Sequence, residues 1–199
     1  MTIPGTLFLF AILFAIARTG FPIQCEVSLR VTTRNQRSTS LRNCGPEFDT
    51  CQSLVIEATR FGKTVRTVKK FCSTKASCVP GAVFMHVEKG LKETGHNLCC
   101  STNGCNTVVP PVPVWNETPN GLWCPSCSVQ HPDKCEKETT RCKGLENQCF
   151  KRTIGNNVHM GCATEAFCAN SAHARITITN TQGVQMSRHE IECSRAPQM

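Results

Sequence analysis

The sequence predicts an all-β, disulfide-rich fold made of two small tandem domains. Three observations carry this prediction: 16 cysteines among 199 residues, an internal repeat in the gaps between them, and long inter-cysteine segments rich in β-branched residues. Tyr is absent, and aromatic residues make up only 6% of the chain. Because so few large side chains are available for a core, we expect covalent cross-links to supply much of the stability.

The first segment, residues 1–20, is expected to be a signal peptide. Residues 7–17 form an uncharged apolar run, and Ala15 and Ala17 offer small residues for cleavage there or a few positions later. A membrane-spanning helix needs roughly 18 apolar residues, and Arg18 ends this run earlier. The tail after Cys193 lacks the features of a lipid-anchor signal. We therefore expect a secreted chain without a transmembrane segment or lipid anchor, in a compartment where disulfides persist.

The cysteine spacing divides the rest of the chain into two halves with eight cysteines each. Gaps of six and of five residues recur in the same order in both halves, which indicates an internal repeat. An even number in each half allows every cysteine to pair within its own half, although spacing alone leaves the pairing open. The expected units are a first domain at 21–107, a Pro-rich linker at 108–121 and a second domain at 122–199.

The linker contains no cysteine and is rich in proline, which favours an extended and semi-rigid backbone. It also contains the single Asn-x-Ser/Thr sequence of the chain, at Asn116. Such a sequence in a secreted protein is an acceptor for N-linked glycan. We therefore expect a glycoprotein modified at Asn116.

Three segments are expected to form β-hairpins. Residues 53–71 carry β-branched side chains on both sides of a break at Gly62. Residues 153–160 form a shorter version with a turn at Gly155, and residues 175–186 alternate Ile and Thr before a turn-forming stretch. No segment shows sustained helical periodicity.

The sequence Cys124-Pro125-Ser126-Cys127 could be the redox centre of a thiol-disulfide oxidoreductase. Such a centre needs a strand that passes into a helix, whereas this motif continues through a Pro-containing loop to another cysteine. A four-thiolate zinc site usually combines two close cysteine pairs, and this half has one. The histidines are scattered, and no hydrolase or phosphate-binding motif occurs. We therefore expect a non-enzymatic protein without a cofactor or metal.

The net charge of +8 is unevenly distributed. Residues 25–106 contain twelve Lys and Arg against six Asp and Glu, whereas residues 124–193 contain eight against seven. The excess gathers on the first expected hairpin, at Arg60, Lys63, Arg66, Lys69 and Lys70. These residues are candidates for binding an acidic protein, a sulfated glycan or an anionic lipid surface. They could equally be a solvated face whose charges prevent edge-to-edge pairing.

The sequence LCCSTNGCN, at 98–106, resembles the closing signature of the Ly-6/uPAR three-finger family. In the second half, NGLWCPSC, DKCEKETTRCKGLENQC, GCATEAFC and a final IEC resemble more narrowly the gamma-type phospholipase A2 inhibitors. The resemblance covers nearly the whole mature chain. It implies two tandem three-finger domains of the snake-toxin-like kind, with Asn106 ending the central sheet of the first domain through side-chain hydrogen bonds to nearby backbone.

The resemblance also implies the disulfide pairing, which places Cys124 and Cys127 in different bridges. The first domain departs from the family pattern because it lacks the second cysteine of the opening Cys-x-x-Cys and its partner, and the second domain lacks a closing Cys-Cys pair. The implied bridges are Cys25–Cys51, Cys44–Cys72, Cys78–Cys99, Cys100–Cys105, Cys124–Cys149, Cys127–Cys135, Cys142–Cys162 and Cys168–Cys193.

The function implied by the resemblance is extracellular protein binding, with inhibition of a secreted phospholipase A2 as its specific form. The alternative, from another class, is an adhesion or signalling ligand for a cell-surface receptor or a sulfated matrix glycan. No nucleic-acid partner is expected from either interpretation.

Overall fold

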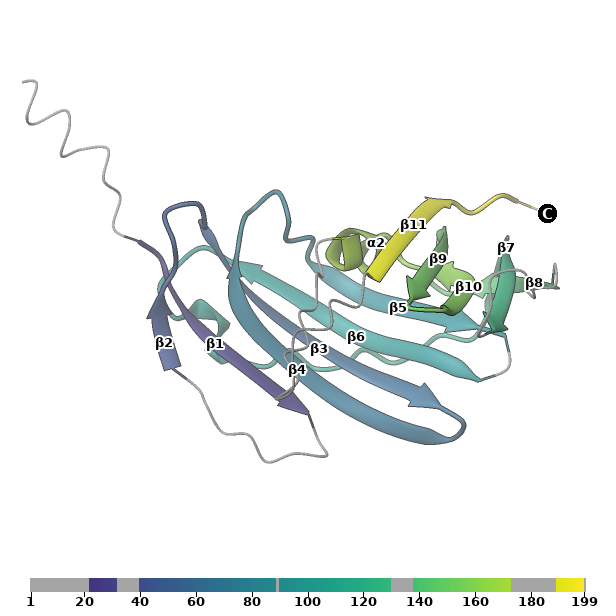
Figure 1. The fold of residues 1–199 in the computed structure, drawn as a ribbon, viewed down its shortest axis with the longest axis horizontal. Helices are drawn as coiled ribbons and strands as arrows, with labels where there is room; N and C mark the ends of the chain where they lie inside the picture. The colour runs from purple at the N-terminus through teal and green to yellow at the C-terminus, as the bar shows by residue number, and fades with distance from the viewer. Residues whose placement is uncertain (1–21, 32–39, 89, 130–137, 173–188, 199) are drawn as a thin grey trace, which may run out of the picture.

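A computed structural model describes residues 22–31, 40–88, 90–129, 138–172 and 189–198 (Figure 1). The expected signal peptide at 1–20 and the expected hairpin at 175–186 lie outside the described residues. Cys135, the implied partner of Cys127, lies outside them as well.

Antiparallel strands dominate the described residues, with one short α-helix and one 3-10 turn. The elements are β1 (Gln24–Val31), β2 (Ser40–Asn43), β3 (Thr50–Arg60), β4 (Lys63–Ser73), β5 (Gly81–Val87), β6 (Leu91–Cys100), η1 (Cys105–Thr107), β7 (Pro119–Val129), β8 (Glu138–Lys143), β9 (Gln148–Ile154), β10 (Asn157–Ala163), α2 (Glu165–Ala172) and β11 (His189–Arg195). The strand order is β11-β9-β10-β5-β6-β3-β4-β1-β2, and β7 pairs with β10 and β8. The expected all-β, disulfide-rich fold is confirmed.

The hairpin predicted at 53–71 is the longest in the described chain and comprises β3 and β4. Eleven residue pairs join the two strands, from Thr50 opposite Ser73 to Arg60 opposite Lys63. The chain reverses through two residues, Phe61 and Gly62, as a tight two-residue turn. Figure 1 shows this turn at the end of the sheet that points away from β2. The turn predicted around Gly155 also forms, between β9 and β10.

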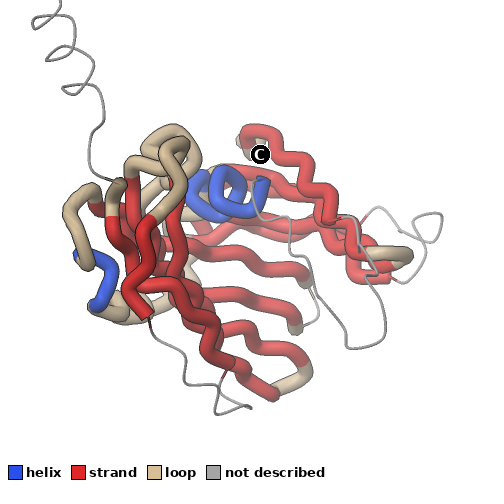
Figure 2. The backbone as a smooth tube through the Cα atoms, turned by 60° about the vertical axis from the view of Figure 1, so that its left-hand side comes forward, coloured by secondary structure: helices blue, strands red, loops and turns tan. Residues whose placement is uncertain are grey.

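The two halves of the chain share one sheet and one apolar core. Strand β10 pairs with β5 at Cys162 opposite His86 and Ala163 opposite Met85. A side chain at Gly161 would collide with the carbonyl oxygen of His86, so glycine allows this close approach of the strands. Residues from β5 of the first half and from β9, β10 and α2 of the second form this core, and Figure 2 shows the longer blue helix lying beside the strands. The buried members of the core are Val83, Met85, Val87, Phe150, Ala163, Ala166 and Phe167.

Helix α2 was not singled out by the sequence analysis, which found no sustained helical periodicity. It has only eight residues, too few for a clear helical periodicity. The backbone amide of Phe167 donates to Thr164 Oγ1 at 3.4 Å, which places a capping hydroxyl just before the first helical residue. The helix is stabilised mainly by packing of Phe167 against Phe150, with ring centroids 5.2 Å apart.

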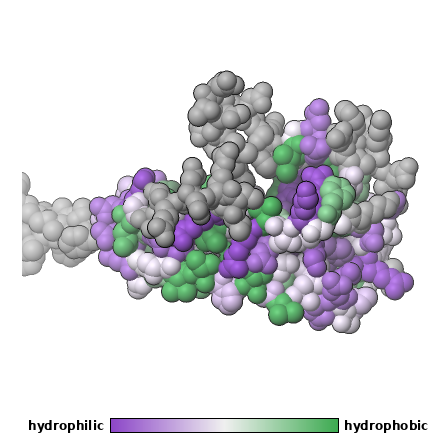
Figure 3. Space-filling view, turned by 90° about the horizontal axis from the view of Figure 1, so that it is seen from below, coloured by the Kyte–Doolittle hydropathy of each residue, from purple (hydrophilic) through white to green (hydrophobic). Residues whose placement is uncertain are grey.

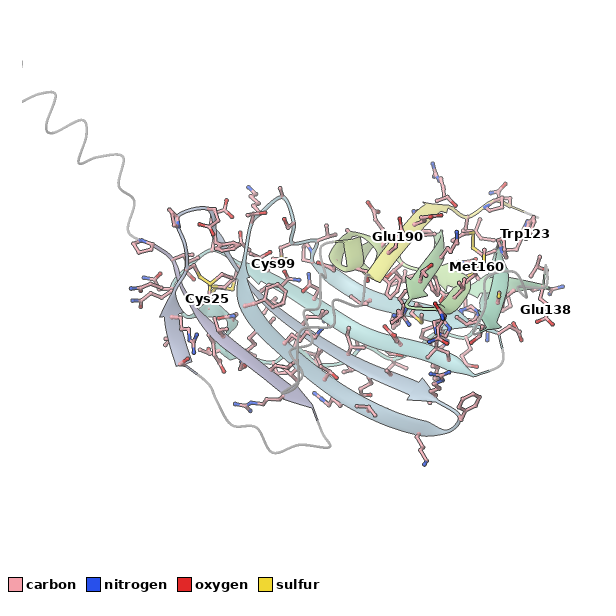
Figure 4. All side chains as sticks on the ribbon, viewed as in Figure 1. Cys25, Cys99, Trp123, Glu138, Met160 and Glu190 are labelled. Atoms are coloured by element: carbon pink, nitrogen blue, oxygen red, sulfur yellow. A yellow bond between two sulfur atoms is a disulfide. The ribbon has the colours of Figure 1, made fainter. Side chains whose placement is uncertain are left out.

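Seven disulfides join described residues. Each joins two cysteines of the same half, and Figure 4 shows disulfide bonds in yellow beside the labels of Cys25 and Cys99. They are Cys25–Cys51, Cys44–Cys72, Cys78–Cys99, Cys100–Cys105, Cys124–Cys149, Cys142–Cys162 and Cys168–Cys193. Cys127 is also disulfide-bonded. The sequence Cys124-Pro125-Ser126-Cys127 therefore contributes its two cysteines to different bridges, as structural cross-links do.

The Pro-rich span between the halves packs against the first half. The Trp115 ring lies 5.2 Å from the Phe84 ring and 5.8 Å from the His86 ring, both edge to face. Residues 119–121, which we assigned to the linker, lie in strand β7. The division into two three-finger domains with a linker between them remains our proposal. The packed span and the shared core show that the two halves are in close contact.

Candidate protein-binding site

The sheet of the first half has two faces with different surroundings. Directly opposed residues of an antiparallel pair share a face, and alternate residues along a strand do so too. We call the side that carries Met85 and Glu93 the inner face, because α2 and β9 of the second half pack there. The other side carries Lys70 and Phe84 and is the outer face, which residues 106–115 cover.

The register separates the five basic residues predicted as a partner-binding group. Arg60, Lys63 and Lys69 lie on the inner face, because Arg60 is opposite Lys63 and Lys69 is an even number of residues further along β4. Arg66 lies on the outer face, with its Nη1 3.1 Å from Glu57 Oε1. The structure therefore does not bring the five together on one surface.

Lys70 is a correction to the predicted binding group, because its side chain is buried. Its ammonium group donates to Glu26 Oε2 at 2.8 Å and also to the carbonyl oxygen of Thr107. A buried charge is held in place only by such partners. Lys70 therefore ties β4 to β1 and η1 and cannot reach a partner protein.

Lys69 is half-buried and lies at the boundary between the solvent-exposed part of the inner face and the part that the second half covers. Burial lowers the pKa of Lys69, and the nearby Glu93 carboxylate works against that shift. Glu93 also accepts from Arg152 Nη1 of β9 at 2.9 Å, in a pair that is largely shielded from solvent. This ion pair crosses from the first half to the second and fixes the covered end of the inner face.

His159 of β10 belongs to the same charged group. Burial is the main cause that lowers the pKa of His159, and the positive charges of Arg152 and Arg60 lower it further against the opposing effect of Glu93. Its Nδ1 lies 3.1 Å from Ser128 Oγ. The neutral imidazole is therefore the favoured form beside the guanidinium groups.

The turn between β3 and β4 exposes an aromatic side chain that the sequence analysis did not single out. Phe61 is 79% exposed, and its backbone has a φ of 50°. The Arg60 guanidinium lies 5.3 Å from the centre of its ring. Val65 (36% exposed) lies further along β4, and Leu29 (51% exposed) lies on β1 opposite Lys69, so both extend the open part of the inner face. The signal in the sequence was a phenylalanine where a two-residue turn favours Asn or Gly.

Asn106 lies at the other end of the first-half sheet and is fully buried. Its Oδ1 accepts from the backbone amide of Glu26 at 2.8 Å. Its Nδ2 donates to the carbonyl oxygens of Glu26 at 2.9 Å and Gln52 at 3.1 Å. Through these three hydrogen bonds the side chain joins β1 to β3, two strands that are not paired with each other.

Asn116 lies on an exposed part of the outer side, beside Trp115. Its Oδ1 accepts from the backbone amide of Thr118 at 3.0 Å, which forms a local turn across the three residues of the acceptor sequence. The side chain is accessible, and glycosylation at Asn116 remains our prediction.

Three groups of described residues have side-chain atoms close enough together to suggest a metal site, and every cysteine in them belongs to a disulfide. Two groups consist of cysteines that belong to disulfides, and the third combines His86 and Glu146 with the bonded Cys162. His86 Nδ1 lies 2.8 Å from Glu146 Oε1, and its Nε2 lies 3.1 Å from Thr140 Oγ1. These contacts link β5 of the first half to the second half. They form a buried polar network that lacks a free thiolate.

Comparisons with known proteins bear on what this surface could bind. No family model matches the chain. The chain is 29% identical over 170 residues to phospholipase A2 inhibitor NAI of Notechis ater, a match that covers 80% of this chain and 84% of the relative. It is 28% identical to a gamma-type phospholipase A2 inhibitor of Laticauda semifasciata, over 64% of this chain and 75% of the relative.

The chain is thus similar over most of its length to proteins named phospholipase A2 inhibitors. A third relative, a gamma-type phospholipase A2 inhibitor of Elaphe climacophora, is 31% identical over 60% of this chain and 64% of its own length. The crystal structure of mouse TEX101 is 19% identical with a TM-score of 0.34, and the match covers 86% of this chain and 98% of that one. Among the residues whose structure is described, no helix is long and apolar enough to cross a membrane.

Proposed function

We propose that the protein is an extracellular, non-catalytic binding protein that inhibits a secreted phospholipase A2. The observation that carries the proposal is its similarity to named phospholipase A2 inhibitors over most of its length. The dense disulfide framework supports an oxidising location outside the cell. A non-catalytic role also agrees with the bonded state of Cys124 and Cys127.

An extracellular ligand of a receptor or a sulfated glycan is the second candidate function. A glycan site would require a dense positive surface. Lys70 is buried against Glu26, and the exposed Arg66 is paired with Glu57 on the other face from Arg60 and Lys63, so the predicted basic group does not form one dense positive surface. The structure therefore supports the inhibitor proposal more than the glycan alternative.

The proposal is tested by titrating the purified full chain into a panel of secreted phospholipases A2. A monomeric short-chain phospholipid should be the substrate, because effects on a lipid surface are then absent. We expect a dose-dependent loss of hydrolysis and a complex with a dissociation constant of about micromolar or tighter for at least one enzyme. Absence of any complex, together with retention on a heparin column or binding to a cell-surface receptor, would replace the inhibitor proposal by the ligand alternative.

A further inference from the structure

We propose that the β3–β4 turn is the anchor of the inhibitory contact, and that Phe61 enters the apolar substrate opening of the bound phospholipase A2. This inference rests on the proposed function and names the part of the chain that performs it. Four properties of the turn support it: its conformation, its exposure, its rigidity and the charges beside it.

The conformation of the turn is unfavourable for the residue that occupies it. Phe61 and Gly62 have φ values of 50° and 76°, so both central residues are in the left-handed region. Glycine adopts this region freely, whereas a bulky side chain does so at a cost. Such outliers gather at functional sites, because the surrounding structure holds them against the cost. Asn would fit the first position better, so local folding does not explain Phe61.

Packing does not explain Phe61 either. The side chain is 79% exposed, and the Arg60 guanidinium lies beside its ring. An aromatic side chain left in water forgoes the stabilisation that its burial would give. A partner that covers Phe61 would recover this free energy on binding. Exposed aromatic residues beside arginine are typical of the residues that dominate protein interfaces.

The turn is presented on a rigid support. Strand β3 pairs with β4 up to Arg60 opposite Lys63 and with β6 up to Arg60 opposite Leu91. At the far end of the hairpin, Cys51 and Cys72 are each tied by a disulfide. A side chain held in this way loses little conformational freedom on binding, which favours affinity.

The charges beside the turn indicate what kind of opening it fits. Arg60 and the exposed Lys63 flank Phe61, and the nearest carboxylate of the hairpin, Glu57, is paired with Arg66 on the outer face. A complementary partner site is therefore apolar at its centre and bordered by carboxylates. An enzyme that hydrolyses a phospholipid ester must admit an apolar acyl chain. Phe61 would occupy that entrance in competition with the substrate.

The arrangement of the other exposed apolar residues favours a protein over a lipid surface. Val65 and Leu29 lie on the open part of the inner face, and Leu29 is opposite Lys69. Lys69 is six residues from the start of β4, about 20 Å along the strand. The apolar residues thus follow the side of the hairpin, and an edge of a folded partner can contact both the tip and the side. In Figure 3, which views the molecule from below, the visible apolar residues form separate patches interrupted by polar ones.

The test compares the wild-type chain with Phe61→Asn, which suits the turn conformation and removes the ring, and with Phe61→Trp, which keeps an aromatic anchor. Leu145→Asn is the matched control, because it removes another exposed apolar side chain in the second half. Affinity for a secreted phospholipase A2 is measured by calorimetry without lipid, and inhibition is measured with a monomeric substrate.

We expect Phe61→Asn to weaken binding by about tenfold or more and the other two variants to stay within about threefold of wild type. Inhibition by the wild-type chain should raise KM and leave kcat unchanged, because the ring and the substrate compete. A wild-type chain that inhibits, with Phe61→Asn equally potent, overturns this inference and leaves the proposed function standing. Failure of the wild-type chain to bind any enzyme of the panel overturns both.

The remaining alternative is that the turn binds a lipid surface. A flotation assay with vesicles of phosphatidylcholine, alone or mixed with phosphatidylglycerol, tests it. We expect no flotation of the wild-type chain in the absence of enzyme. Flotation that is lost in Phe61→Asn, with unchanged affinity of that variant for the enzyme in solution, would contradict the inference and assign the turn to a lipid surface.

Discussion

The two ends of the β3–β4 hairpin differ in every respect that bears on stability and recognition. At one end, Cys51 and Cys72 enter disulfides, Lys70 is buried against Glu26, and the Asn106 side chain bonds to the Gln52 carbonyl oxygen. At the other end, the hairpin is closed by two residues with positive φ. Figure 4 shows Cys25 and Cys99 in the disulfide-rich part of the sheet, distant from the turn.

One hairpin can therefore separate the residues that hold the fold from those available to a partner. The disulfide-rich end is buried and cross-linked, so changes there should act on the free energy of unfolding. The turn contributes little burial, so changes there should act on binding. Variants at the two ends of the hairpin test that separation.

The largest effect on the free energy of unfolding is expected for Lys70→Met. Lys63→Met, on the same strand, is the matched control. Lys70→Met removes the cation that neutralises buried Glu26 and should lower the free energy of unfolding by about 3–5 kcal/mol. Lys63→Met, at the exposed end of β4, should change it by less than about 0.5 kcal/mol. Denaturant unfolding under non-reducing conditions measures both. Similar losses in the two variants would show that the ends of the hairpin are not distinct.

A smaller but clear loss is expected for Asn106→Ala. The change leaves the backbone amide of Glu26 and the carbonyl oxygens of Glu26 and Gln52 without their hydrogen-bond partner. Each unsatisfied buried group costs about 1–3 kcal/mol, unless a water molecule takes the place of the lost side chain. We expect a net loss of about 2–3 kcal/mol with all disulfides intact. Asn106→Asp, which keeps the acceptor and loses the donors, should also destabilise the chain. A variant as stable as wild type would show that the disulfides alone hold β1 to β3.

The pH dependence of stability tests the charged group near the covered inner face. The pKa of His159 is lowered in the folded state, so at a pH below the unfolded value of 6.5 the unfolded chain binds the proton first. The contribution of His159 is therefore fully present at higher pH and is lost progressively as the pH falls through 6.5 toward the folded value.

The measurement is the difference in Tm between about pH 7.5 and about pH 5.5 for wild type and His159→Gln. The variant should lose less stability on acidification. Arg60→Gln should also reduce the loss, because it removes one of the positive charges that lower the pKa of His159. Identical Tm changes in wild type and His159→Gln would contradict the assigned cause.

The weakest effect on stability is expected at the turn itself. Phe61→Asn replaces a strained residue by one that tolerates positive φ. We expect thermal unfolding to show either no change or a gain of up to about 1 kcal/mol. A loss larger than about 1 kcal/mol would show that the ring stabilises the hairpin, and a role in binding would no longer be needed to explain Phe61.

Local patterns in the sequence were sufficient for the fold class and for the two described hairpins. The β-branched runs on both sides of Gly62 and Gly155 predicted β3–β4 and β9–β10, because strand preference and turn chemistry are local properties. Helix α2 escaped prediction since its stability comes from contacts of Phe167 with Phe150 and other core residues. Such contacts join segments that the sequence does not show to be neighbours.

The candidate site was predicted less completely. The charge count found the hairpin, but it could not show that Lys70 is buried against Glu26, because that contact joins residues 44 positions apart. Phe61 was overlooked although a phenylalanine beside Gly62 is unusual for a two-residue turn, because the sequence does not show how exposed its ring is. Its significance depends on its exposure and on its φ value, which only the structure shows.

Hydrogen–deuterium exchange of the chain, alone and in complex with a secreted phospholipase A2, would show directly which end of the hairpin meets the enzyme. We expect new protection to concentrate in residues 58–66, around Phe61, while the disulfide-rich end near Cys51 and Asn106 is already protected in the free chain and changes little. Protection confined to the second half, or to the Trp115 side of the first-half sheet, would contradict the assignment of the turn as the inhibitory contact.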